Sequence, residues 1–152
     1  MIGSALIGAV AGMRAMTPLA TVSAATRAGE LPQAPGLLAH PLVVAGSMAV
    51  AAGEIAGDKM KTAPDRIVIA GMAARVTTAS IAGAAMATRD RRVAGAAVAV
   101  AAAIGAAYLT FALRVRAMRR YGQDATGMVE DMLALGGAAL IVHTLAPADA
   151  RH

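Results

Sequence analysis

The feature that most constrains the fold is a run of 21 residues without a charge, residues 93 to 113, which reads VAGAAVAVAAAIGAAYLTFAL. An α-helix needs about 20 apolar residues to cross the ~30 Å hydrocarbon core of a bilayer. The run therefore predicts a transmembrane helix.

Composition and charge agree with a membrane protein. Hydrophobic residues make up 58% of the chain and charged residues only 15%, which is more apolar than an ordinary soluble domain. The net charge of +5 is carried by short basic clusters between the apolar runs, and not by one continuous face. Such clusters are typical of topology signals at membrane surfaces, so we expect no nucleic-acid partner.

Four further apolar segments lie at residues 2 to 26, 41 to 57, 67 to 88 and 128 to 146. The predicted fold is therefore all-α: one polytopic transmembrane helical bundle over residues 1 to 152, with about five spans. An alternative concerns the first segment, which contains Arg14 followed by Pro18. If proline breaks this segment into a re-entrant pair, four spans remain, the parity of the topology changes and the carboxyl terminus ends inside.

The distribution of Lys and Arg gives the expected orientation. In the five-span arrangement, the connections on one side carry seven of these residues and those on the other side carry five. Because cytoplasmic loops are enriched in Lys and Arg, the amino terminus is expected inside. The arginine run of Arg114, Arg116, Arg119 and Arg120 is expected to contact anionic lipid headgroups on the inner face.

Charged residues within the apolar segments are the candidate functional residues. Each costs at least a few kcal/mol in a membrane, so such groups usually face the bundle interior and pair with one another. The candidates for binding a substrate or ion are Arg14, Glu54, Asp58, Arg75, Glu130 and Asp131. Supporting roles are expected for Thr17, Lys59, Arg66 and Thr78.

Two interpretations of these residues are open. Glu54 and Asp58 share one helical face at a spacing of four residues, and can hold a cation or pair with an arginine. Arg14 with Thr17 and Thr21, and Arg75 with Thr78, form polar stripes at helical spacing that can bind an anion. Alternatively, an arginine–carboxylate network only fixes the register of the helices, and the threonines bond to their own backbone.

Several of these residues occur together in blocks that resemble a known family. The blocks are Gly12-Met13-Arg14-Ala15-Met16-Thr17-Pro18, Glu54-Ile55-Ala56-Gly57-Asp58-Lys59, Pro64 with Arg66, Arg75, and Glu130-Asp131. Over nearly the whole chain they are similar to the bacterial membrane family known as domain of unknown function 4126. The resemblance implies a multi-pass protein of the bacterial inner membrane and implies no activity.

The functional expectation is a small homo-oligomeric transporter or channel in which the charged cluster binds an ion or a small anionic solute. The alternative is a non-catalytic membrane scaffold or accessory subunit. An enzyme is less favoured, because the sequence has no cysteine and no HExxH, GxSxG or nucleotide-binding glycine motif. No metal and no cofactor are expected, and the expected partners are membrane lipid and further copies of the chain.

Overall fold

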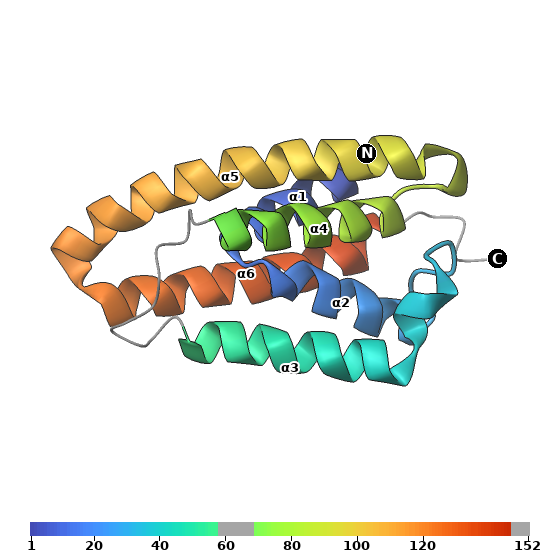
Figure 1. Ribbon diagram of the computed structural model, residues 1–152, viewed down its shortest axis with the longest axis horizontal. Helices are drawn as coiled ribbons and strands as arrows, with labels where there is room; N and C mark the ends of the chain where they lie inside the picture. The colour runs from blue at the N-terminus through green and yellow to red at the C-terminus, as the bar shows by residue number, and fades with distance from the viewer. Residues whose placement is uncertain (58–68, 147–152) are drawn as a thin grey trace.

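The computed structural model describes residues 1 to 57 and 69 to 146, and these residues are helical without strands (Figure 1). The six α-helices are α1 (Ile2–Met13), α2 (Met16–Arg27), α3 (Pro41–Gly57), α4 (Ile69–Ala85), α5 (Arg92–Tyr121) and α6 (Gln123–Leu145). Two short 3₁₀ turns, η1 (Gly36–Ala39) and η2 (Arg89–Arg91), precede α3 and α5. The all-α prediction is confirmed for this part of the chain.

Two helices of the described chain, α5 and α6, are long and apolar enough to cross a membrane. The uncharged run from 93 to 113 lies entirely within α5, which at 1.5 Å per residue is about 45 Å long. Only 17% of the most apolar window of α5 and 28% of that of α6 is buried inside the bundle. Both helices therefore present most of their apolar surface outward, unlike the core helices of soluble proteins. Five membrane-crossing helices are not shown.

The expected single helix over residues 2 to 26 is interrupted at Arg14. α1 ends at Met13, and Arg14 has an extended backbone with φ −137° and ψ 115°. The interruption lies four residues before Pro18, whose ring would clash with the carbonyl of residue 14 in a continuous helix. Pro18 itself is in the first turn of α2, where its missing N–H group costs little. The structure thus follows the alternative in which this segment is broken.

α1 and α2 form a hairpin, residues 2 to 27, which we call the broken-helix hairpin. The start of α1 lies beside the start of α5, since a Cβ atom at Gly95 would be 3.1 Å from Oγ of Ser4. The chain after α2 returns to the same end, because Arg92 donates to the carbonyl of Gln33. The apex of the hairpin, at Arg14 and Ala15, lies inside the bundle, since these two residues are 2% and 6% exposed.

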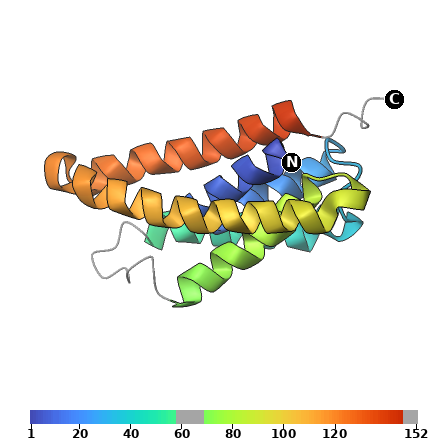
Figure 2. The same ribbon diagram turned by 90° about the horizontal axis from the view of Figure 1, so that it is seen from above.

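α1 is the central helix and packs mainly against α5 and α4, with α6 on its other side (Figure 2). Glycine permits this close approach. A Cβ atom at Gly8 would lie 2.2 Å from the carbonyl oxygen of Ala99, and one at Gly12 would lie 2.4 Å from that of Ala103. Since Gly8 and Gly12 face alanines also four residues apart, α1 and α5 run in the same direction and the hairpin reaches about halfway along α5.

We expect Gly8→Ala to destabilise the protein by about 1–3 kcal/mol, because the added methyl group has to push α5 away from α1. Thermal unfolding in detergent measures the change. Gly53→Ala in α3 is the matched control, since its Cβ atom has open space and alanine is the better helix former. Equal stability of the two variants would show that α1 and α5 do not pack this closely.

Candidate functional site

Arg14, at the apex of the hairpin, connects three parts of the bundle. Its side chain is 2% exposed and forms an ion pair with Asp131 of α6. Its Nη1 atom also donates to the main-chain carbonyl of Glu54 in α3, at 3.4 Å. This carbonyl belongs to the last turn of α3, where the helix dipole favours a positive charge. The buried cation therefore contacts the carboxylate of Asp131 and the carboxyl-terminal end of α3.

The carboxylate of Glu54 binds the amino-terminal end of α2. Its Oε1 accepts a hydrogen bond from the backbone N–H of Ala15 and its Oε2 accepts one from Met16, each at 2.9 Å. These N–H groups have no partner within α2, because the first turn of a helix leaves its donors unsatisfied. A carboxylate is favoured at this position by both the hydrogen bonds and the helix dipole. Glu54 thus acts as a cap supplied by another helix.

Arg75 binds the other half of the break. Its Nε donates to the carbonyl of Gly12, at 3.1 Å, near the carboxyl-terminal end of α1. Arg75 is 5% exposed, so this contact takes place in the interior. The break consequently has a cation at the end of α1 and an anion at the start of α2, the polarity that the two helix dipoles favour. Three predicted site residues besides Arg14 meet at this one apex: Glu54, Arg75 and Asp131.

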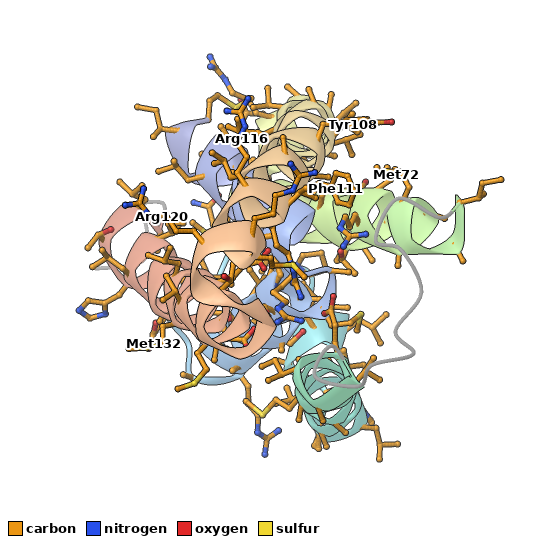
Figure 3. All side chains as sticks on the ribbon, turned by 90° about the vertical axis from the view of Figure 1, so that its left-hand side faces the viewer. Met72, Tyr108, Phe111, Arg116, Arg120 and Met132 are labelled. Carbon is orange, nitrogen blue, oxygen red and sulfur yellow. The ribbon has the colours of Figure 1, made fainter. Side chains whose placement is uncertain are left out.

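The contact that the structure gives for Glu130 lies away from the apex of the hairpin. Its Oε2 accepts from Nη1 of Arg114 on α5, at 3.0 Å, and both side chains are 10% exposed. Arg114 therefore forms an ion pair between α5 and α6, and its contact with lipid headgroups stays a prediction. Arg116, Arg119 and Arg120 are exposed at the end of α5, as the first and last of these show in Figure 3.

The threonines were expected either to help bind an anion or to bond to their own backbone, and the structure shows a different state for different threonines. Oγ1 of Thr78 donates to the carbonyl of Ala74 at 3.0 Å, and Oγ1 of Thr21 to that of Thr17 at 2.9 Å, so both bond to their own helix. Thr17 differs, because its side-chain oxygen is buried and has no hydrogen-bond partner among the described residues. It lies in the first turn of α2, next to the N–H groups that Glu54 binds.

The remaining predicted site residues are Asp58, Lys59 and Arg66, which lie outside the described residues. Within the described ranges, no group of three or more His, Asp or Glu side chains is arranged to hold a metal ion. His143, on α6, is exposed.

A groove of about 730 Å³ runs along α2 between α3 and α6. Thr17 and Ile55 line it near the apex of the hairpin, and Glu30 and His143 line it near the end where α2 terminates. Most of the remaining lining consists of small or apolar side chains such as Ala24. The groove thus connects the surface of the bundle with the neighbourhood of the charged apex.

The sequence did not indicate two parts of this site. Arg114 belongs to a basic run in the sequence, since three further arginines follow it within six residues. Its position 16 residues before Glu130, on the other side of Gly122, is the signal of a helical hairpin that brings the two side chains together. The carbonyl of Gly12 and the N–H groups of Ala15 and Met16 become binding groups only because the helix is broken.

We expect Arg14→Met and Asp131→Asn each to cost about 3–5 kcal/mol of stability, because each leaves one buried charge without its partner. The double variant should lose at least about 1 kcal/mol less than the sum of the single losses. Unfolding in detergent gives the three values. Arg116→Met, at an exposed position on α5, is the control and should change stability by about 0.5 kcal/mol or less. Additive losses would show that the two charges do not interact.

Comparison of the chain with protein-family models, with curated protein sequences and with solved structures gives no match. The functional inference therefore rests on the residues of this chain and on their contacts. The central observation is a buried apex at which one broken helix meets charged side chains from α3, α4 and α6.

Proposed function

We propose that this chain is a multi-pass protein of the bacterial inner membrane that moves an ion or a small anionic solute, with its site at the apex of the broken-helix hairpin. In this proposal α3, α4, α5 and α6 cross the bilayer, and the hairpin enters and leaves on one side. The same proposal has three further parts. The chain belongs to the family known as domain of unknown function 4126, it assembles into homo-oligomers, and its exposed arginines contact anionic lipid.

The observation that carries the proposal is the broken helix whose ends meet Glu54 and Arg75 in the interior. Non-helical backbone at membrane depth is tolerated only where it is buried in protein or lines a cavity. In many transporters, half-helix ends of this kind form the substrate and ion sites near the middle of the membrane. The groove that extends to Thr17 supplies a route to such a site.

The membrane location is supported by the outward faces of the two long helices. Leu109 and Leu113 of α5 and Met132, Leu133 and Leu140 of α6 are all more than half exposed. Large contiguous apolar surfaces of this kind mark contact with lipid or with other proteins. With hairpin topology, the seven Lys and Arg residues of the predicted inner side follow α3 or lie at the end of α5, so both chain ends are placed outside.

A scaffold function is the second candidate, and a specific observation favours it. Arg14 is almost fully enclosed and bonded to Asp131 and to the end of α3. A network of this kind can serve only to fix how the helices pack. The two functions differ in whether water reaches the groove, because transport requires a hydrated route to the apex and a scaffold requires none.

We expect single cysteines at Ala28, Ala24 and Thr21, on the groove side of α2, to react with a small charged thiol reagent added from one side of the membrane. The native chain has no cysteine, so the background is clean. A cysteine at Val22, which is buried against the core on the same helix, is the control and should not react. Reaction at position 28 alone, in folded protein, would favour the sealed scaffold.

We expect reporter fusions to place Gly122 in the cytoplasm and both ends of the chain outside it. Fluorescent-protein fusions report a cytoplasmic position and alkaline phosphatase fusions an external one. The amino terminus is decisive, because five spans place it on the same side as Gly122 and the hairpin places it on the opposite side. Phosphatase activity at Gly122, or a cytoplasmic amino terminus, would contradict the proposed topology.

A further inference from the structure

We infer that the amino-terminal end of α2 is a binding site for a small monocarboxylate, and that Glu54 occupies this site from within the chain. The inference rests on the proposed function and names its substrate class. It concerns the first turn of α2, the side chain of Glu54 and the hydroxyl group of Thr17.

The geometry of Glu54 defines the shape of the ligand. Its two carboxylate oxygens each accept one backbone N–H, from Ala15 and from Met16, at 2.9 Å. Two adjacent donors directed at the two oxygens of one carboxylate form a fork that matches a planar anion. The last two carbons of Glu54 and its oxygens have the composition of an acetate ion. Acetate or a similar ion therefore has the right size for the space that this side chain fills.

Thr17 provides an independent indication of a ligand. Its residue is 1% exposed, and its Oγ1 has no hydrogen-bond partner among the described residues. A buried hydroxyl without a partner costs about 1–3 kcal/mol, so such groups are rare unless they have a function. Thr17 follows Met16 directly and lines the groove. Its covered hydroxyl group is a further polar group beside the first turn of α2 that has no partner within the described chain and can donate to an anion bound there.

The charge of the apex selects a monovalent anion. The carboxylate of Glu54 contributes one negative charge to an apex that also holds Arg14, Arg75 and Asp131. When this carboxylate withdraws, the apex loses one negative charge. One monovalent anion restores the original charge, whereas a divalent anion adds a second buried negative charge, which is costly.

The groove determines where the rest of the ligand lies. Its inner part is lined by Thr17, Ile55 and alanines such as Ala20 and Ala51. A carboxylate bound to the first turn of α2 can place a methyl or short alkyl group against this apolar lining. Glu54 competes as a tethered carboxylate, and tethering gives it an effective concentration of roughly millimolar or above. Binding of a free carboxylate to the native chain therefore requires displacement of Glu54.

The test is rescue of Glu54→Ala by sodium acetate, measured as the unfolding temperature in detergent. We expect about 0.1 M acetate to raise the Tm of Glu54→Ala by about 3 °C, and to leave the native protein unchanged. Sodium chloride at the same concentration should have no such effect. Glu30→Ala, which removes an exposed carboxylate near the outer part of the groove, is the matched control and should not respond to acetate. Thr17→Val in the Glu54→Ala background should reduce the rescue at least about twofold.

Equal stabilisation by acetate and chloride, or by acetate in the control variant, would overturn the inference. If Glu54→Ala does not fold even with acetate, Glu54→Gln decides, because the neutral amide holds the two N–H groups less well than a carboxylate does. Acetate should then raise the Tm of Glu54→Gln, and no change would refute the site. If acetate rescues Glu54→Ala but the cysteines along α2 do not react, the carboxylate site stands and the transport function is refuted. If the cysteines react but acetate gives no rescue, the transport function stands and the carboxylate site is refuted.

Discussion

The structure depends on how one broken helix is satisfied inside an apolar bundle. A break at Arg14 leaves backbone carbonyls at the end of α1 and N–H groups at the start of α2, and the residues at the break, Arg14 and Ala15, are buried. Glu54 and Arg75 satisfy the two sets, each with the charge that the helix dipole favours. The charged residues therefore do more than compensate one another, because they make the interior break possible and hold α3 and α4 against it.

Much of this fold could be predicted from the sequence, and the limit lies at Pro18. The length of the uncharged run identifies α5, and the other apolar segments identify the regions of the remaining helices. These patterns are visible because each one is contained in a short continuous stretch of the sequence. A proline can bend the segment slightly or reverse its direction. Which of the two occurs, and hence the direction of α2, depends on the groups that satisfy the backbone at the break. One of these groups comes from residue 54, far along the chain, and a local pattern does not report it.

That charged residues of the apolar segments meet can be expected from the sequence, whereas the partner of each one cannot. A charge in an apolar segment needs compensation, and the structure brings Arg14, Glu54, Arg75 and Asp131 together at the apex. Glu130 was grouped with them, yet it pairs with Arg114. Adjacent residues on a helix point about 100° apart, so Asp131 and Glu130 can face different neighbours. Which neighbour each one meets depends on tertiary packing.

The pairing of Arg14 with Asp131 also constrains the order in which the protein can be assembled. The two residues are separated by 117 positions, so the ribosome synthesises the cation long before its carboxylate. Until α6 is made, the nascent hairpin has no Asp131 to neutralise Arg14, and burial of the guanidinium is costly. In the proposed membrane arrangement, the hairpin therefore reaches its final depth only after α6 has been inserted.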